Sequence, residues 1–253
     1  TSLTRHFAHG FQLTANYTWS KWWGVCCSTN ADSSPGIVIP KYFYLNDAAE
    51  PGDRAQVFNL AAIGQSPFGK GKEFMKTGVG AALLGGWQLS GVFTAFTGFP
   101  FSVSADGTSL NAPGSSQRAN QALPQVSMPR SPNEWFNPYA FQPVTTPSFG
   151  TAGFDSVYGP GAIDLDLSLF RNIRLSERFT LQFRADAFNI SNTPNYSSPG
   201  SDVSSVTYAT NPNGTPNYSK IVNLNGFGQI TGTNAYARLL AQRYFRFGAK
   251  LIF

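Results

Sequence analysis

Asp164 and Asp166 are alternate residues that could form a carboxylate pair for acid–base chemistry. Two carboxyl groups divide the roles of general acid and general base when their surroundings separate their pKa values. On a strand, residues two apart share a face, so Ser168 would lie beside them. Arg184 and Asp186 would come to the same face from the next segment. This arrangement favours a wall of paired charges over a dedicated catalytic site.

Histidine and cysteine offer little further material for chemistry. The histidines are His6 and His9, too few for a His-based zinc site or a serine-type triad with the residues around them. Cys26 and Cys27 are adjacent, about 3.8 Å apart at Cα, whereas a disulfide needs about 4.4–6.8 Å. We interpret them as loop residues. The sequence therefore predicts no catalytic residue, no metal site, no cofactor and no enzymatic activity.

Two glycine-rich segments are similar to nucleotide-binding motifs but are incomplete. Residues 64–71 lack the final Ser or Thr of a phosphate-binding loop, and residues 78–83 lack the third glycine of a dinucleotide fingerprint. We predict a turn for the first and a glycine-rich hairpin connection for the second. The net charge is +5, yet its densest basic cluster is only Lys70-Gly-Lys72. A phosphate-tracking surface needs a basic stripe, so nucleic acid is not an expected partner.

The composition indicates a sheet that meets water on one face only. Charged residues make up 12% of the chain and aromatic residues 15%, whereas about a quarter of an average globular domain is charged. A membrane-spanning sheet fits this bias. A soluble β-sandwich with one core face also fits and remains an alternative.

Apolar and polar residues alternate along several segments, as in half-buried strands. The expected strands cover residues 10–20, 54–64, 86–103, 163–175, 179–187 and 243–253, with part of another at the N-terminus. A turn at 176–178 would place Leu175 opposite Phe179, so that the apolar sets of both strands share one face. The sequence thus predicts an all-β fold with about six to seven antiparallel strands.

The connections alternate between long and short. Residues 23–53, 105–161 and 191–241 form long loops rich in Gly, Pro, Asn and Ser, and the links at 67–85 and 176–178 are shorter. In an up-and-down sheet every second connection lies at the same end. Outer-membrane barrels have short periplasmic turns and long extracellular loops, so this parity places the long loops outside and the C-terminus in the periplasm.

Strand length and end residues support a membrane location. A spanning strand needs about 9–11 residues, and Tyr17, Trp19, Trp22 and Trp23 lie where an interfacial aromatic girdle would be. Arg171 falls on the apolar face, and we expect it near the periplasmic interface, where its side chain can reach water. The uncharged residues 77–105 contain too many Gly and polar positions for a lipid-facing helix.

Aromatic residues cluster in two of the long loops. They could stack on a ligand, or they could pack the loops against one another, and the sequence leaves both interpretations open. The ligand-contact candidates are Tyr42, Tyr44, Trp135, Phe136, Tyr139 and Phe141.

Several phrases, in order along nearly the whole chain, resemble the C-terminal barrel of Oar-like TonB-dependent receptors. The resemblance implies a barrel of about 22 strands with a plugged lumen, in a bacterial outer membrane, that imports a scarce ligand with energy from the inner-membrane TonB complex. The phrases are residues 10–21, Leu84-Gly-Gly-Trp-Gln-Leu-Ser-Gly91, Thr97-Gly-Phe-Pro-Phe101, Trp135-Phe-Asn-Pro138, Gly159-Pro-Gly161, Phe183-Arg-Ala-Asp-Ala-Phe-Asn-Ile190 and Phe247-Gly-Ala-Lys-Leu-Ile-Phe253.

Under this resemblance, residues 1–253 are the C-terminal part of such a receptor, and the plug domain is absent. The terminal Phe253, with Phe245 and Phe247 on the same strand, resembles the signal read by the barrel-assembly machinery. The implied partners are outer-membrane lipid and lipopolysaccharide, that machinery, the TonB complex through absent N-terminal regions, and a small-molecule, saccharide or peptide ligand. Two alternatives remain: a smaller adhesin or porin-like barrel, and a secreted carbohydrate-binding β-sandwich.

Overall fold

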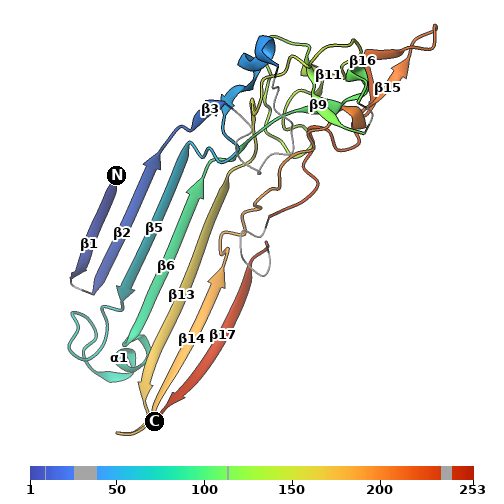
Figure 1. The fold of residues 1–253 in the computed structure, drawn as a ribbon. Coiled ribbons are helices and arrows are strands. Elements are labelled where there is room, and N and C mark those ends of the chain that lie inside the picture. The colour runs from blue at the N-terminus through green and yellow to red at the C-terminus, as the bar shows by residue number, and fades with distance from the viewer. Residues whose placement is uncertain (9, 26–38, 113, 235–240) are drawn as a thin grey trace.

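The computed structural model describes residues 1–8, 10–25, 39–112, 114–234 and 241–253. Its main element is a seven-stranded antiparallel sheet in which neighbours follow chain order, β1-β2-β5-β6-β13-β14-β17 (Figure 1). This meander confirms the predicted all-β, up-and-down fold. The strands are β1 (Ser2–Ala8), β2 (Phe11–Trp19), β5 (Gln56–Gln65), β6 (Trp87–Phe96), β13 (Ala162–Arg174), β14 (Thr180–Phe188) and β17 (Tyr244–Ile252).

The strand register gives the sheet one apolar and one polar face. Leu165 lies opposite Phe93, which lies opposite Leu60 on its other side. One position along, Asp164 lies opposite Thr94. Because side chains alternate between the two faces, one such pair fixes the face of every other residue in both strands. The apolar face comprises Leu3, Leu13, Ala15, Tyr17, Phe58, Leu60, Ala62, Leu89, Phe93, Leu165, Leu167, Leu169, Leu181, Phe183, Ala185, Phe245, Phe247 and Leu251.

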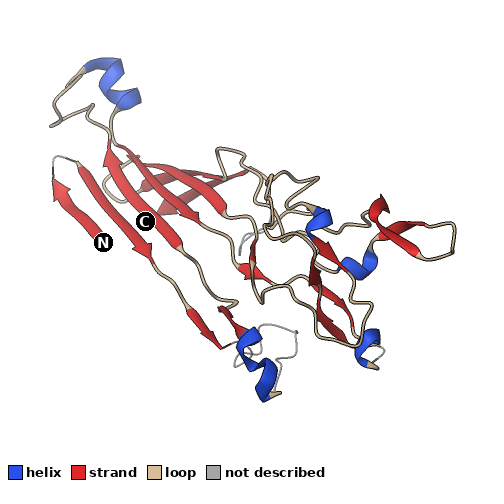
Figure 2. Ribbon diagram, turned by 90° about the horizontal axis from the view of Figure 1, so that it is seen from above, coloured by secondary structure: helices blue, strands red, loops and turns tan. Residues whose placement is uncertain are grey.

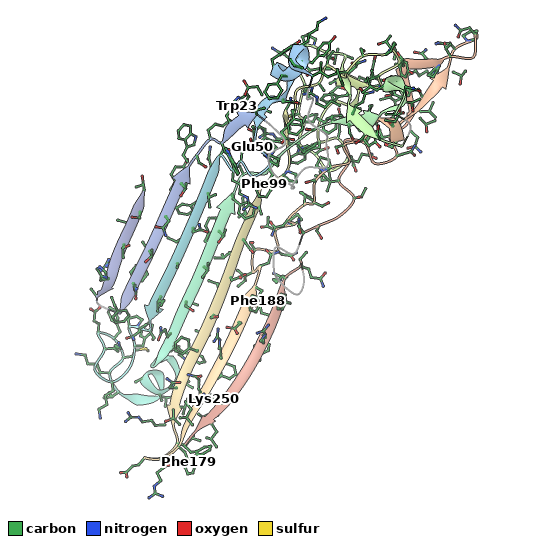
Figure 3. The ribbon with its side chains drawn as sticks, viewed as in Figure 1. Trp23, Glu50, Phe99, Phe179, Phe188 and Lys250 are labelled. Carbon is green, nitrogen blue, oxygen red and sulfur yellow. The ribbon has the colours of Figure 1, made fainter. Side chains whose placement is uncertain are left out.

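The tight turn between β13 and β14 forms where the sequence predicts it. The backbone N–H of Leu175 donates to the carbonyl of Phe179 at 2.9 Å, and the hydroxyl of Ser176 accepts from the N–H of Phe179 at 3.2 Å. Leu175 and Phe179 therefore lie opposite each other, as expected. Figure 3 shows Phe179 at this end of the sheet, far from the long loops.

The strand predicted over residues 86–103 is shorter than expected. β6 ends at Phe96, and the chain resumes as β7 (Pro100–Phe101), which pairs with β12 (Val157–Tyr158). The break falls at Gly98, where a Cβ atom would lie 2.0 Å from the carbonyl oxygen of Gly159. Two backbones approach there more closely than any side chain allows, so the chain leaves the sheet.

The connection between β5 and β6 contains a short helix, α1 (Gly78–Leu84), where the sequence predicts a simple glycine-rich hairpin connection. That prediction is wrong in this detail. Helices across the described ranges all fall short of the length and apolar character needed to cross a bilayer.

The three long connections lie at one end of the sheet, as the loop parity predicts (Figures 1 and 2). They contain short elements that the sequence does not predict. These are β3 (Trp23–Val25), η1 (Pro40–Asn46), β4 (Asp47–Ala49), β7, β8 (Ser104–Asp106), η2 (Thr108–Leu110), β9 (Ser116–Arg118), β10 (Asn120–Gln121), η3 (Pro138–Ala140), β11 (Phe141–Gln142), β12, η4 (Val203–Ser205), β15 (Thr207–Thr210) and β16 (Pro216–Asn223).

Residues 97–161 and 191–234 fold together into what we call the outer lobe. It has its own hydrophobic core, separate from the sheet, to which both connections contribute. Each connection alone would bury too little apolar surface to offset the entropy lost when it becomes ordered. The buried members are Val103, Ala105, Ala119, Trp135, Phe136, Ala140, Phe141, Val144, Ala152, Val157, Val203, Val206 and Phe227.

Candidate ligand-binding site

The predicted wall of paired charges is present on the polar face. Ser168 lies opposite Asp186, and its hydroxyl donates to the Asp186 carboxylate. The guanidinium of Arg184 lies 2.8 Å from the same carboxylate. Asp166 accepts a hydrogen bond from the N–H of Asn189 at 2.9 Å. These carboxylates are thus used in hydrogen bonds and an ion pair, as the sequence analysis favours.

Phe136 is the centre of the outer-lobe core. Its ring is fully buried and meets the rings of Phe141 and Phe227 edge-on, with centroids 5.6 and 5.2 Å away. Phe141 is buried to the same degree. Phe136 and Phe141 therefore pack within the outer lobe, and a ligand cannot stack on them without opening the lobe. Sequence alternation gives no sign of Phe227, which lies in an irregular Asn-Gly-Phe-Gly segment.

The three tyrosine candidates lie on the surface. Tyr44 and Tyr139 are exposed, and Tyr42 packs edge-on against Phe149 of the outer lobe at 5.4 Å. All remain accessible for contact with a partner, but they do not meet at a common site.

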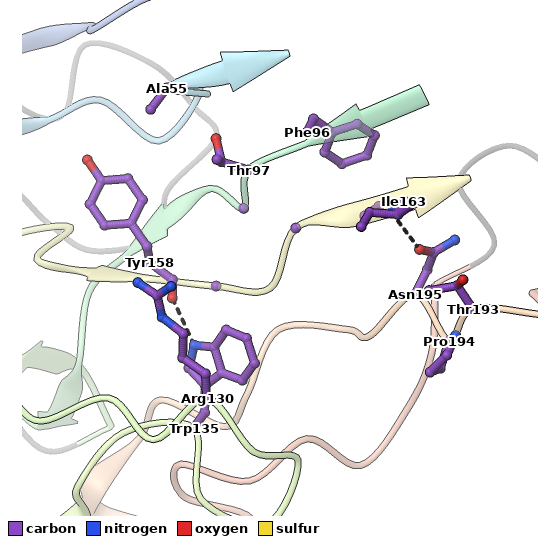
Figure 4. A pocket seen from close by; sticks show the side chains of 14 residues that line it. Ala55, Phe96, Thr97, Arg130, Trp135, Tyr158, Ile163, Thr193, Pro194 and Asn195 are labelled. Atoms are coloured by element: carbon purple, nitrogen blue, oxygen red, sulfur yellow. Dashed lines mark hydrogen bonds between the residues drawn. The ribbon is translucent and has the colours of Figure 1, made fainter. Parts of the chain in front are cut away.

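A cavity of about 610 Å³ lies where the outer lobe meets the ends of β6 and β13 (Figure 4). We call it the junction cavity. The candidate Trp135 contributes to its wall, and its indole N–H donates to the Tyr158 carbonyl at 2.8 Å. Among the described residues, no carboxylate forms an ion pair with the exposed guanidinium of Arg130, which also lines the cavity. The lining residues are Ala55, Phe96, Thr97, Gly98, Arg130, Trp135, Tyr158, Gly159, Gly161, Ala162, Ile163, Thr193, Pro194 and Asn195.

The cavity depends on a close crossing of two backbones. A Cβ atom at Gly161 would lie 2.2 Å from the carbonyl oxygen of Phe96. On the opposite wall, Asn195 accepts a hydrogen bond from the N–H of Ile163 at 3.2 Å and fixes the return of the last long loop. The cavity therefore joins the sheet to two long connections. Of its lining, the sequence analysis singles out Trp135 as a ligand-contact candidate, and Thr97, Gly98, Gly159 and Gly161 only as parts of the quoted phrases.

A polar cluster beside the cavity holds the first long loop. The ammonium of Lys21 lies 3.0 Å from the carboxylate of Asp53 and donates to the hydroxyl of Tyr158 at 2.5 Å. The Tyr158 hydroxyl also donates to the Asp53 carboxylate, at 3.2 Å, and the N–H of Trp22 donates to the other carboxylate oxygen of Asp53 at 2.8 Å. We call Lys21, Asp53 and Tyr158 the clasp, because they join the base of one loop to another.

The clasp shifts both of its charged groups toward their ionised forms. Burial alone would raise the pKa of Asp53, but the N–H of Trp22 and the ammonium of Lys21 outweigh burial and hold it below its ordinary value. The Tyr158 hydroxyl and the Asp53 carboxylate raise the pKa of Lys21 against a smaller effect of burial. Lys21 and Asp53 therefore form an ionic pair at neutral pH, and their shared partner Tyr158 lines the junction cavity.

The remaining predicted residues lie on or near the sheet. Phe245 and Phe247 are exposed on the apolar face, and Phe253 follows β17 almost fully exposed, at 94%. Arg171 also lies on the apolar face, near the end opposite the outer lobe, and its guanidinium donates to backbone carbonyls of α1. Tyr17, Trp19, Trp22 and Trp23 are exposed at the outer end of β2 and just beyond it. Cys26, Cys27 and His9 lie outside the described residues.

The described segments contain no group of three His, Cys, Asp or Glu side chains that could hold a metal ion. In comparison with known proteins, the family model of the outer membrane beta barrel domain matches residues 1–244. No curated protein and no solved structure shows significant similarity to the chain.

Proposed function

Since the chain belongs to the outer membrane beta barrel domain family, which lies in the bacterial outer membrane, we propose that it forms barrel wall and ligand-capturing outer loops of a TonB-dependent receptor. The apolar face of the sheet then contacts lipid, and the polar face lines the lumen. The proposal assigns the chain no catalytic step and no cofactor.

The junction cavity is the observation that carries this proposal. Phe96 and Ala162 line it, and both occupy polar-face positions of their strands, directly opposite each other. The cavity thus lies where the lumen of a closed barrel would meet the outer lobe. Apolar walls with a few polar groups are typical of small-molecule sites. Trp135 and Tyr158 supply ring surface, and Arg130 supplies a positive charge for a small molecule, saccharide or peptide.

The folded outer lobe favours a receptor over a passive pore. A porin needs an open mouth, whereas here two long connections share one core, and the clasp attaches a third to it. Such a cover suits capture of a ligand followed by its energised release. In the Oar-like receptors that the chain resembles, the TonB complex supplies the energy for this release.

Depletion of compounds from the growth medium tests the proposal for a ligand of any chemical class. We expect at least one compound to be depleted only when both the gene for the full-length protein and a working TonB complex are present. Depletion that needs the gene but continues without TonB would indicate a porin-like barrel. If deletion of the gene changes the depletion of no compound under any growth condition, the result would contradict a role in uptake.

Adhesion is a second candidate, favoured by the hairpin of β15 and β16. This hairpin projects from the outer lobe (Figure 1), and Val222 on it is 64% exposed. Replacement of residues 211–215 by a short Gly-Ser turn should reduce attachment of cells to a surface if adhesion is the function. Uptake through the junction cavity should be unaffected by the same change.

Assembly is a separate part of the proposal. Phe245, Phe247 and Phe253 would be read by the barrel-assembly machinery, and the apolar face together with the outer end would contact lipid and lipopolysaccharide. The exposure of all three phenylalanines supports this role. Phe253→Ala should lower the amount of folded protein in the outer membrane, measured by heat-modifiable migration on gels.

A further inference from the structure

The junction cavity has a cationic side chain in its wall and, among the described residues that line it, no Asp or Glu. The cation is Arg130, whose side chain is exposed. Within the described parts of the chain its guanidinium forms no ion pair and no hydrogen bond, and Glu134, the nearest acid along the chain, is not paired with it. A cleft with charge of one sign concentrates ligands of the opposite sign.

The backbone of Arg130 is fixed in the cavity wall by a closed turn. Its N–H donates to the carbonyl of Trp135 at 3.2 Å, and Ser131 and Glu134 exchange backbone hydrogen bonds inside the turn. The N–H of Trp135 then donates to the carbonyl of Gly228 at 2.8 Å, which attaches the turn to the last long connection. Arg130 has a φ of 59°, a left-handed conformation that is uncommon for a residue with a long side chain. Such positions persist where the surrounding structure holds them, and they cluster at binding sites.

The other charges near the cavity balance one another. Asp53 is paired with Lys21 at 3.0 Å. Arg54 lies over the ring of Phe96 at 3.8 Å, and Asp164 lies on β13, so these two residues contribute one charge of each sign. None of the four charged residues lines the cavity. The positive charge of Arg130 is therefore the one that a ligand in the cavity would meet.

The rest of the lining suits the apolar body of such a ligand. Trp135 and Arg130 line the cavity from the outer lobe, and Phe96 lines it from the sheet (Figure 4). The indole N–H of Trp135 is already used by the carbonyl of Tyr158, so the indole offers ring surface. A volume of about 610 Å³ is that of a small-molecule site. Arginine binds carboxylate and phosphate groups through two parallel hydrogen bonds.

The polar face has a second cationic cavity, at the end of the sheet opposite the outer lobe. We call it the basic rim cavity; it measures about 740 Å³, and the described residues that line it include no Asp or Glu. Arg174 and Thr180 line it from the polar face, where they lie opposite each other. An anion therefore meets positive charge at both ends of the lumen that the proposed function assigns to this face. The cationic lining residues are Lys70, Lys72, Arg171 and Arg174.

We propose that the junction cavity selects an anionic ligand. Arg130 binds the carboxylate or phosphate group of this ligand, and the rings of Trp135 and Tyr158 contact its apolar body. This inference rests on the proposed function, because it names the class of ligand that the receptor captures at the same cavity. Neutral saccharides and cationic peptides are then poor ligands, since neither offers an anionic group to Arg130.

Ligand-observed saturation-transfer NMR of the purified full-length protein tests the site with three probes that share a phenyl ring. Phenylacetate carries a carboxylate, phenyl phosphate carries a phosphate, and phenylacetamide is neutral. We expect at least one anion to bind the wild type more tightly than phenylacetamide does, and Arg130→Gln to reduce this preference about tenfold. The tighter of the two anions identifies the group that the cavity takes.

Two further variants serve as controls. Arg130→Lys keeps the charge and should retain part of the preference. Lys220→Gln removes an exposed cation of the outer lobe that does not line the cavity, and it should bind like the wild type. Heat-modifiable migration shows whether each variant is folded.

Equal binding of the three probes by the wild type would overturn the proposal. An anion preference that Arg130→Gln keeps in full would overturn it as well. If Lys70→Gln/Arg174→Gln removes that preference instead, the anion binds at the basic rim cavity and not at the junction cavity.

Failure of this inference can be distinguished from failure of the proposed function, because probe binding needs neither uptake nor the TonB complex. An anion preference that depends on Arg130, without TonB-dependent depletion of any compound, would contradict uptake and leave the anion site standing. TonB-dependent depletion of a compound without a carboxylate or phosphate, at the same rate in the wild type and Arg130→Gln, would support the receptor and overturn the anion site.

Discussion

The carboxylate of Asp53, whose side chain is fully shielded from solvent, lies 3.0 Å from the ammonium of Lys21. These residues lie at the two ends of the first long connection, and Tyr158 joins both of them to the outer lobe. One buried acid thus positions two connections that belong to different hairpins of the sheet.

Asp53→Asn should loosen the first long connection. The variant keeps the shape but removes the charge that Lys21 and Tyr158 contact, at a cost of about 1–2 kcal/mol in the free energy of unfolding of the outer end. We expect the lower part of this range because Lys21 is 41% exposed and water screens the pair. Limited proteolysis measures the opening. Glu134→Gln, which removes an exposed acid of the outer lobe, is the control and should be cut like the wild type.

The stabilising effect of the clasp should depend on pH. The folded-state pKa of Asp53 is lowered, so its contribution is fully present above the unfolded value and is lost as the pH falls through the folded value. The folded-state pKa of Lys21 is raised, so its contribution is present below the unfolded value and is lost at higher pH. The difference between wild type and Asp53→Asn should hold from about pH 5 to 9 and shrink as the pH falls below the ordinary pKa of an aspartate, about 3.9. A difference that grows as the solution is made more acidic would contradict this assignment.

Phe136→Ala should unfold the outer lobe while the sheet stays intact. The side chain is fully buried among aromatic rings, and such a truncation costs about 3–5 kcal/mol. Protease should then remove the outer lobe, while heat-modifiable migration of the barrel is kept. Tyr139→Ala removes a ring that is 43% exposed and should leave the lobe stable. Equal stability of the two variants would show that Phe136 is not a core residue.

Leu167→Arg should impair insertion of the barrel. Leu167 lies in the middle of β13 on the apolar face, and a cation facing lipid at the bilayer midplane costs about 2–4 kcal/mol. Ser90→Arg places the same side chain at nearly the same depth on the polar face, near Asp186 of the wall. Folded protein in outer-membrane fractions should fall for the first variant only. Equal yields would contradict the assignment of faces.

Gly161→Ala should distort the junction cavity. Its Cβ atom would lie 2.2 Å from the carbonyl oxygen of Phe96, so the backbone must move, at a cost of roughly 1–3 kcal/mol. Gly232→Ala is a matched control in the outer lobe, because the added atom would meet Ser197 at 3.4 Å, an ordinary contact. We expect the first variant alone to lose ligand uptake. Uptake at the wild-type rate in Gly161→Ala would exclude this cavity as the binding site.

The sheet was predictable from the sequence because the patterns that specify it lie within single strands and short turns. A period of two fixes which residues of a strand share a face, and short turns such as 176–178 force neighbouring strands to pair. Ser168 and Asp186 could therefore be placed opposite each other without coordinates. The positions of the three long loops followed from parity alone. The end of β6 could not be predicted in this way, since Gly98 is crowded by Gly159, a residue far along the chain.

The outer lobe and helix α1 were decided only by tertiary structure. Loops carry no periodicity, so the sequence left open whether Phe136 packs or binds, and its contact with Phe227 joins two separate connections. The bond between Lys21 and Tyr158 spans 137 residues. The sequence by itself thus determined which residues share a face of the sheet, through backbone alternation, and at which end of the sheet the long loops lie. The cavities and the clasp arise from contacts between distant segments, whose pairing no local pattern encodes.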